Sequence, residues 1–405
     1  MNVMTGNKRW AVPLALLLCV ILAFFDKISI AALFSDDQFL ADLGIAGHRE
    51  KLGLLMTAFL LAYGFSSTFL SFIGDLISPF KLLMGMMISW GIIMFFMGRA
   101  TSYEEMLFYR VLLGIAEGPL FAIAYTIVKK LFEQKEQARA TMLWLLGTPI
   151  GAAIGFPITL YVLGHYGWRA TFYVMASITI IVVLIAYFVL KNIDLAKSQA
   201  HANVIPKLQF TDHVKASHVL IKDLSFWLVC IFNIAFLTYL WGFNSWLPSY
   251  LKAKGIAQGS LGFFTSLVFV GMLVGEVFGS IVSDKINKRA LMCMISLIGA
   301  GLGLIIAINV DSHYALIAAV SFSATFWGIG APNVFALLAK VTDARVSATA
   351  GGIFNGLGNF SSSLAPWIIA LLVTATNNMN VGILFLAIMS FLGSFVLIPH
   401  VLKKI

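Results

Sequence analysis

The sequence predicts an all-α integral membrane protein in which twelve transmembrane helices form two pseudo-symmetric halves of six. Of its 405 residues, 60% are hydrophobic and 11% are charged, a composition typical of a polytopic membrane protein rather than a soluble one. A helix needs about 20 apolar residues to cross the hydrocarbon, so the chain has room for about twelve such helices and no sizeable soluble domain. A short motif occurs in both halves and indicates the pseudo-symmetry: Asp75 precedes Lys81-Leu-Leu-Met, and Asp284 precedes Arg289-Ala-Leu-Met.

Apolar segments define the expected helices, and one polar stretch separates the two halves. The first segment is too long for the core of a signal peptide and has no small-residue cleavage site, so we expect it to remain as a membrane helix. The expected helices lie at about residues 10–34, 51–73, 81–99, 104–129, 139–163, 168–190, 224–251, 259–282, 289 onward, 314–338 and 347–374, with a last one ending at Pro399. The predicted organisation is therefore an N-terminal six-helix bundle at 1–190, a cytoplasmic linker at 191–223 and a C-terminal six-helix bundle at 224–405.

The positive charge follows the expected topology. The formal net charge is +9, which in a soluble protein would suggest a nucleic-acid partner. If both termini lie inside, nineteen of the 27 lysines and arginines fall in inner regions, six in outer regions and two in the membrane. This bias fits the positive-inside rule. We therefore expect a multi-pass protein of a bacterial inner membrane with both termini cytoplasmic, surrounded by membrane lipid and without a nucleic-acid partner.

Two segments carry charged residues inside runs that otherwise belong in lipid. Arg110 and Glu117 are two helical turns apart, so both lie on one face of the fourth helix, and Gly114 leaves room between them. Asp26 and Lys27 form the other such pair, in the first helix. Charges at membrane depth are costly and tend to mark ion or substrate pathways. We expect the first and fourth helices to face each other and to form a charged site near mid-membrane.

The two carboxylates of this site, Asp26 and Glu117, are the candidate proton carriers. Desolvation of a buried carboxylate favours its protonated form and a nearby cation favours its ionised form, so the two effects oppose each other beside Lys27 and Arg110. That balance suits a group that binds and releases a proton in the physiological range. The alternative interpretation is a permanent pair of salt bridges that holds the first and fourth helices together.

The two cations, Lys27 and Arg110, are candidate anchors for an anionic substrate. A carboxylate in a cavity of low dielectric constant is held by a cation far more strongly than it is in water. Two alternatives stay open. Arg110 forms an ion pair with Glu117 instead of binding substrate, and Lys27 extends its amino group to the membrane interface.

Five stretches of the sequence carry recognisable motifs. They are Asp26-Lys27, Arg110-Val-Leu-Leu-Gly-Ile-Ala-Glu117-Gly, Trp246-Leu-Pro-Ser-Tyr-Leu, Ala331-Pro-Asn and Gly352-Ile-Phe-Asn355-Gly-Leu-Gly-Asn359. Together they resemble the major facilitator superfamily of transporters, and within it the anion:cation symporter branch of organic-anion and sugar-acid symporters, sialin and the vesicular glutamate transporters. The resemblance covers nearly the whole chain, and its most specific parts are those in the fourth and eleventh helices.

The resemblance implies a proton-coupled role for carboxylates at positions 26 and 117, a substrate-anion role for the cation of the first helix, and a monomer. The sequence departs from the family pattern at three places. Lys27 stands where the branch usually has arginine, and Leu76 and Ser78 replace the arginine and second glycine of the inner-turn motif. Lysine is a point charge, whereas arginine can grip a carboxylate with two parallel bonds, so the substrate class can differ.

Two further sets of residues complete the predicted site. Polar or aromatic residues on helices that line the family's cavity are candidate substrate contacts, although each alone is more often a packing residue; they are Tyr63, Tyr125, Trp241, Asn244, Asn355 and Asn359. Residues of the two inner turns are candidate gating residues; they are Asp75, Lys81, Asp284 and Arg289. Glu276, near the inner end of the eighth helix, is expected to have a structural role and to pair with a base of a neighbouring inner loop.

Several function classes are disfavoured. The seven histidines lie outside the expected helix centres, and neither a phosphate-binding glycine loop, a metal cluster nor a nucleophile–base pair stands out, so we expect no enzyme, no ATP-driven pump, no metal and no cofactor. The predicted function is proton-coupled symport of a small organic anion by alternating access. The alternatives are an exchanger or effluxer of amphipathic or zwitterionic molecules, and a transporter-like receptor or membrane enzyme. Sodium in place of the proton also stays open.

Overall fold

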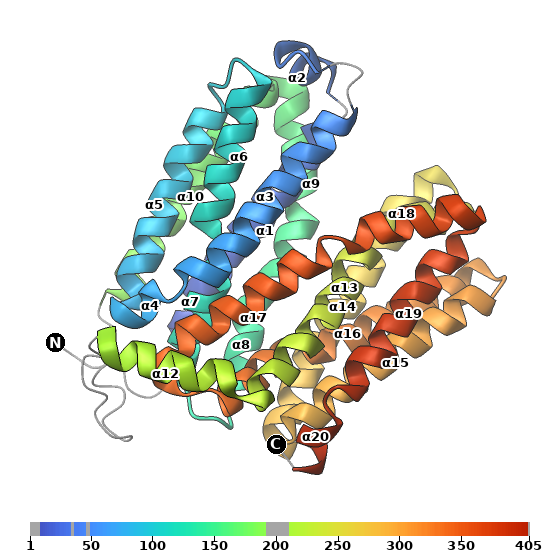
Figure 1. Ribbon diagram of the computed structural model, residues 1–405. Helices are drawn as coiled ribbons and strands as arrows, with labels where there is room; N and C mark the ends of the chain where they lie inside the picture. Colours follow the sequence, from blue (N-terminus) through green and yellow to red (C-terminus); the bar gives the residue numbers. More distant parts are fainter. Residues whose placement is uncertain (1–8, 34–35, 46–48, 192–209, 404–405) are drawn as a thin grey trace. The chain divides into compact units, whose positions relative to one another are not determined.

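A computed structural model describes residues 9–33, 36–45, 49–191 and 210–403, and this part of the chain is almost entirely helical (Figure 1). Ten of its helical segments are long and apolar enough to cross a membrane. They are residues 54–76, 79–97, 103–131, 168–190, 224–247, 263–286, 289–309, 313–341, 344–373 and 379–402. Two further helices, α1 (Ala11–Leu33) and α9 (Gly147–Tyr166), have 23 and 20 residues, enough for about 30 Å at 1.5 Å per residue. The predicted all-α class and twelve long helices are therefore confirmed.

The chain forms two compact units. The first consists of residues 1–132, 143–218 and 343–356, and the second of residues 133–142, 219–342 and 357–405. The predicted domain boundaries at 190 and 224 remain a prediction. The structure also places a helix inside the predicted linker, α12 (Phe210–Lys222), which lacks the length and the apolar run of a membrane span.

In the first unit, glycines let the helices approach closely. α1 packs against α9 and α10 (Trp168–Leu190), and α3 (Arg49–Leu70) packs against α6 (Tyr103–Glu117). A Cβ atom at Gly151 of α9 would lie 2.5 Å from the carbonyl oxygen of Ile21, and one at Gly114 of α6 would lie 2.4 Å from that of Phe59. α9 and α6 are thus packed closely against α1 and α3, respectively, because only glycine permits these backbone distances.

The remaining helices of the first unit complete its bundle. They are α2 (Asp37–Asp42), α4 (Ile73–Leu76), α5 (Pro79–Met97), α7 (Leu120–Leu131) and part of α8 (Gln137–Leu145). The 3₁₀ turn η3 (Ala344–Val346) and the first ten residues of α17 (Ser347–Ser362) also belong to this unit.

The second unit contains the long helices of the C-terminal half. They are α13 (Leu224–Ala253), α14 (Gln258–Ile286), α15 (Arg289–Asn309), α16 (His313–Val341), α18 (Ala365–Thr376), α19 (Met379–Phe395) and α20 (Ile398–Leu402). α16 packs against both α14 and α15, and α15 also packs against α19. The contact between α14 and α16 is again made by glycine, because a Cβ atom at Gly275 would lie 1.9 Å from the carbonyl oxygen of Thr325.

Three of the predicted helices are interrupted within their predicted bounds, and the twelfth, predicted to end at Pro399, is followed after a short break by α20. A proline lies at or near the start of each second piece. The fourth helix divides into α6 and α7 at Gly118-Pro119, and the fifth divides into α8 and α9 shortly before Pro149. The eleventh and twelfth divide before Pro366 and Pro399. Proline has no N–H for the preceding turn but is well accommodated in the first turn of a new helix. The interruptions are local, because residues 103–131, 344–373 and 379–402 each still form one span that is long and apolar enough to cross a membrane.

A small cluster at the end of one span fastens α2 to the start of α10. Asp42 accepts hydrogen bonds from the indole Nε1 of Trp168, at 3.0 Å, and from the guanidinium of Arg169. The guanidinium also lies over the Trp168 ring, 4.1 Å from its centroid. The hydrogen bond from Arg169, followed by that from Trp168, lowers the pKa of the Asp42 carboxyl below its usual range.

Replacing Gly275 by alanine tests the packing of α14 against α16. The added methyl group overlaps the carbonyl of Thr325, so we expect a loss of about 1–3 kcal/mol of stability. Thermal unfolding in detergent measures it. The matched control is Gly85→Ala in α5, where a Cβ atom meets nothing within 4 Å among the described residues, and it should not lower the melting temperature. Equal melting temperatures for the two variants would contradict the close packing.

The Asp42 cluster predicts a dependence of stability on acid pH. Because the pKa of Asp42 is lowered in the folded state, its contribution is complete above the ordinary value of about 3.9 and is lost as the pH falls through the lowered pKa. Asp42→Asn should therefore lower the melting temperature at neutral pH and flatten its decline at acid pH. Asp311→Asn, at an exposed position, serves as the control. An unchanged acid decline in Asp42→Asn would assign it to other carboxylates.

Candidate functional site

The predicted charged residues of α1 and α6 lie together in the first unit, and all four are buried. The exposed fraction is 1% for Asp26, 5% for Lys27, 1% for Arg110 and 0% for Glu117. The Lys27 Nζ atom lies 3.7 Å from Glu117 Oε2, so these two form an ion pair between the helices. This contact joins the first and fourth predicted helices, which we expected to face each other through their charged residues.

Aromatic rings surround the ammonium group of Lys27. Its Nζ atom lies 4.3 Å from the ring centroid of Tyr63, 4.9 Å from that of Phe24, and 5.8 and 5.9 Å from those of Phe121 and Phe59. The face of an aromatic ring carries partial negative charge and attracts a cation, most strongly where water is excluded. The rings and Glu117 together hold the cation inside the bundle rather than at the interface that the alternative interpretation required.

Arg110 is engaged with α3. Its Nε atom donates to the carbonyl oxygen of Leu55 at 3.2 Å, and its guanidinium lies over the Phe59 ring, 4.3 Å from the centroid. In the part of the chain that the structure describes, Arg110 makes no ion pair, and Glu117 pairs with Lys27. The guanidinium is thus fixed by a backbone carbonyl and a ring, and its positive charge is not matched by a contacting carboxylate.

The two carboxylates differ in their hydrogen bonding. The indole Nε1 of Trp90, on α5, donates to Asp26 Oδ2. Among the described residues, Asp26 Oδ1 and both oxygens of Glu117 have no hydrogen-bond donor. A buried acceptor without a donor is costly, and that cost falls when the carboxylate takes up a proton or when a ligand supplies a donor.

Other predicted contact residues of the first unit adjoin this cluster. Asn355 of α17 donates from Nδ2 to the Tyr63 hydroxyl at 3.2 Å and to Ser67 Oγ at 3.0 Å. Tyr63 therefore touches both Lys27 and Asn355. Tyr125 of α7 also lies against α17, since a Cβ atom at Gly351 would meet its ring at 2.9 Å.

The remaining predicted contact residues belong to the second unit. Trp241 of α13 donates from Nε1 to Asn359 Oδ1 at 3.1 Å. Asn244, one turn further along α13, is half-buried, and its Oδ1 atom has no hydrogen bond within the described ranges. These three residues present indole and amide groups but no charge.

The inner-turn residues of the first unit surround the start of α17. Asp75 accepts hydrogen bonds from the backbone N–H groups of Ala348 and Thr349, both at 2.8 Å, and from Thr349 Oγ1 at 2.7 Å. It therefore acts as an external cap for a helix N-terminus, which favours a negative charge. Lys81 is exposed at the start of α5.

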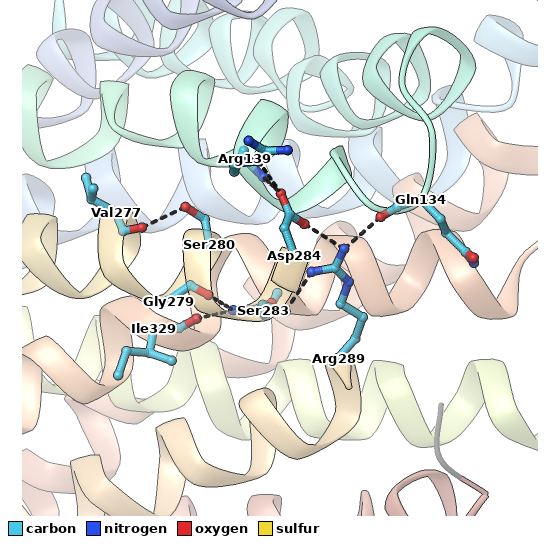
Figure 2. Close-up of polar contacts among 10 residues, drawn as sticks. Gln134, Arg139, Val277, Gly279, Ser280, Ser283, Asp284, Arg289 and Ile329 are labelled. Carbon is cyan, nitrogen blue, oxygen red and sulfur yellow. Dashed lines mark hydrogen bonds and ion pairs between the residues drawn. The ribbon is translucent and has the colours of Figure 1, made fainter. Parts of the chain in front are cut away.

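The corresponding turn of the second unit forms a charged cluster (Figure 2). Asp284 Oδ2 accepts from Arg139 Nε at 2.8 Å, and its Oδ1 accepts from Arg289 Nη2 at 2.6 Å. Arg289 also donates to Ser283 Oγ and to the carbonyl oxygen of Gln134, both at 2.7 Å. The segment 133–142 is thus fastened to the end of α14 through one aspartate and one buried arginine.

Sequence reasoning missed several residues of these clusters. Trp90 and the three phenylalanines around Lys27 carry no sequence signal, because aromatic residues are frequent throughout the chain and most of them face lipid or the core. Arg139 and Gln134 lie in a charged loop whose partner in space the sequence does not reveal. In the described residues, no group of three or more His, Cys, Asp or Glu side chains has the arrangement of a metal site.

Comparison with known proteins decides the class. A family model described as Major Facilitator Superfamily matches residues 16–366, and a second match covers residues 251–403. The chain belongs to the Major Facilitator Superfamily. It is accordingly an integral, multi-pass membrane transporter and not an enzyme.

Relatives within the superfamily differ in their named substrates. The chain is 25% identical over 373 residues to a probable sulfoacetate transporter, SauU, of Cupriavidus necator, a match that covers 88% of this chain and 85% of that protein. It is also 25% identical over 406 residues to a quinolone resistance transporter of Acinetobacter baumannii, covering 94% and 90%. The solved structure of the proton:xylose symporter XylE superposes with a TM-score of 0.80 at 12% identity, covering 98% of this chain and 96% of that one. That likeness concerns the fold.

Trp90→Phe tests the contact that the sequence did not reveal in this superfamily member. The change removes the donor to Asp26 and keeps a ring in place, so we expect a loss of about 1–3 kcal/mol of stability from the unsatisfied carboxylate. Thermal unfolding measures it, with the exposed Trp367→Phe as the control. If Trp90→Phe were no less stable than that control, Asp26 would not depend on the indole.

Proposed function

We propose that this chain carries a small organic anion across the membrane together with a proton, by alternating access. The observation that supports the proposal most directly is the buried ion pair between Lys27 and Glu117, beside Arg110 and Asp26. The four side chains carry two positive and two negative charges when all are ionised. An anion that enters this site alone adds an unbalanced charge, and a proton that enters with it restores neutrality.

The steps follow from this balance. A proton bound by Glu117, or by Asp26, cancels one negative charge beside the cations. Lys27 is then freed from its ion pair and attracts the carboxylate of the substrate. With a substrate of one negative charge the loaded site is neutral, as the empty unprotonated site is, and both forms can move between the two faces of the membrane; a dianion needs a second proton, which the other carboxylate can bind. The proton gradient sets the direction.

The substrate class rests on the charges and on the relatives. Lys27 and Arg110 are the proposed anion anchors, and Arg110 suits this role because no carboxylate pairs with it within the described residues. Sulfoacetate, named for the Cupriavidus necator relative, is a small organic anion. We further propose that the uncharged part of the substrate is contacted by Tyr63, Tyr125, Trp241, Asn244, Asn355 and Asn359.

The inner turns are the proposed gates. Asp75 holds the start of α17, and Asp284 with Arg289 holds the segment 133–142, so either contact must break if these segments move during the cycle. Lys81 is placed at the same turn as Asp75. We propose that the halves 1–190 and 224–405 move about the substrate, that the linker 191–223 and both termini face the cytoplasm, and that the protein works as a monomer in a bacterial inner membrane.

One observation favours a second candidate function. The Acinetobacter baumannii relative is named for quinolone resistance and is as identical to this chain as the sulfoacetate relative. Export of an amphipathic or zwitterionic molecule in exchange for protons uses the same carboxylates with the direction reversed. It is kept as the alternative outcome of the test below.

Glu117→Gln tests the proton coupling. In proteoliposomes with an imposed inward proton gradient, the wild type should accumulate one anion from a labelled panel of sugar acids, sulfonated acids, short carboxylates and amino acids. An uncoupler should abolish this accumulation. Glu117→Gln cannot release a proton at this position, so its uptake should stop when the concentrations on the two sides are equal.

The matched control is Glu104→Gln, an exposed position on the same helix, which should accumulate the anion like the wild type. Accumulation that persists in Glu117→Gln would make this glutamate structural and would transfer the role to Asp26. Accumulation that follows a sodium gradient instead would show that sodium, and not the proton, is the coupling ion. Quinolone extrusion without uptake of any anion would favour the second candidate function.

A further inference from the structure

Glu276 is a buried carboxylate that the proposed transport site does not use. It lies in α14, in the second unit, and its exposed fraction is 0%. Neither of its oxygens has a hydrogen-bond donor among the described residues. The expectation that a base of an inner loop stands beside it therefore finds no such partner in the described part of the chain.

The ionisable groups of the helices packed against α14 do not compensate this carboxylate. Those helices are α13, α15 and α16. Their titratable residues are Cys230, Tyr239, Tyr250, Lys252, Arg289, Cys293, His313, Tyr314 and Lys340. Arg139 of α8 also reaches α14, at Asp284. Arg289 is committed to Asp284, eight residues or about 12 Å further along α14, and Lys340 is about 18 Å along α16 from the level of Glu276. The hydroxyls of Tyr239 and Tyr250 are hydrogen-bonded to Ser323 and to the Ala307 carbonyl oxygen.

The helix opposite Glu276 offers an acceptor rather than a donor. α16 contains Pro332, which has no N–H, so the carbonyl of Gly328 lacks the donor that a regular helix would supply. Gly328 faces α14 at this level, because a Cβ atom there would lie 2.1 Å from the Met272 carbonyl oxygen and 3.0 Å from the Glu276 nitrogen. One turn further on, Asn333 Nδ2 donates to the carbonyls of Ile329 and Gly279, which are labelled in Figure 2. These two carbonyls are therefore satisfied, whereas the buried Asn333 Oδ1 has no donor among the described residues and is a second acceptor near α14.

An ionised carboxylate and a protonated carboxyl behave differently in this place. The ionised form only accepts hydrogen bonds, and without a cation or donor its burial is very unfavourable. The protonated form is neutral, and its O–H can donate to a carbonyl. The geometry thus combines a buried acid without a counter-charge with a backbone acceptor that proline has deprived of its donor.

We propose that Glu276 is a second proton-binding site, separate from Asp26 and Glu117, which holds a proton while α14 packs against α16 and donates its O–H to the Gly328 carbonyl. Loss of this proton leaves a charge in the tight interface formed by Gly275, Gly279 and Gly328. Deprotonation therefore loosens the α14–α16 contact, and protonation closes it. The ligand of this site is the proton itself.

Infrared spectroscopy of the full-length protein in lipid nanodiscs tests the proposal. At neutral pH the wild type should show the C=O stretching band of a protonated carboxyl at Glu276, and Glu276→Gln should lose one carboxyl equivalent from this band. Glu104→Gln, an exposed glutamate, should lose nothing. Identical protonated-carboxyl bands in the wild type and Glu276→Gln would overturn the proposal.

Thermal unfolding across about pH 5 to about pH 9 supplies an independent readout. The wild type should lose stability as the pH rises through the titration of Glu276, because the folded state holds the proton. Glu276→Gln keeps a neutral donor for Gly328, so its profile should lack this loss, whereas Glu276→Leu should be less stable than Glu276→Gln at acid pH. A loss in Glu276→Gln equal to that of the wild type would contradict the proposal. Proton-driven uptake that persists in Glu276→Gln and fails in Glu117→Gln would show that the two sites are distinct.

Discussion

A charge inside an apolar bundle must be compensated, and the first unit is arranged around this constraint. Lys27 meets it with one carboxylate and four rings, and Arg110 with a carbonyl and one ring. Both solutions need α3 close to α1 and α6, since Phe59 touches both cations. Gly114 permits that approach, because any side chain there would strike the Phe59 carbonyl. Arg110, Gly114 and Glu117 therefore act together: the glycine lets α3 approach, and α3 contacts the cations of the site.

Much of this arrangement could be predicted from the sequence, because it depends on residue types that are rare in apolar segments. Charged residues are scarce in the apolar segments, so Asp26, Lys27, Arg110 and Glu117 stand out, and hydrophobicity alone locates the helices. The role of Trp90 could not be predicted, because aromatic residues are common in this sequence and no residue near Trp90 in α5 distinguishes it from the others. The interruptions of the helices could be predicted only in part. Pro119, Pro149, Pro366 and Pro399 are visible, but Pro332 shows that a proline need not end a helix.

The two inner turns show how a repeated motif can diverge in its contacts. Asp284 is bound by two arginines, one of them the buried Arg289, whereas Asp75 is bound by backbone N–H groups at the start of α17. The motif's arginine position holds Leu76, and the basic residue at its end, Lys81, is exposed. Asp75 accepts these hydrogen bonds from backbone N–H groups at a helix N-terminus, where the macrodipole is positive. The same residue type is thus retained while the source of positive potential changes.

The lysine of the charged site bears on what such a site can select. An arginine would present a planar fork and fix the orientation of a carboxylate through two parallel bonds. The ammonium of Lys27 instead sits among rings that hold a cation without directional bonds, and a single carboxylate oxygen lies near it. An anion that displaces Glu117 from this position is therefore recognised there chiefly by its charge and size. Directional recognition then depends on Arg110, whose guanidinium is already oriented by the Leu55 carbonyl, and on the hydroxyl and amide of Tyr63 and Asn355.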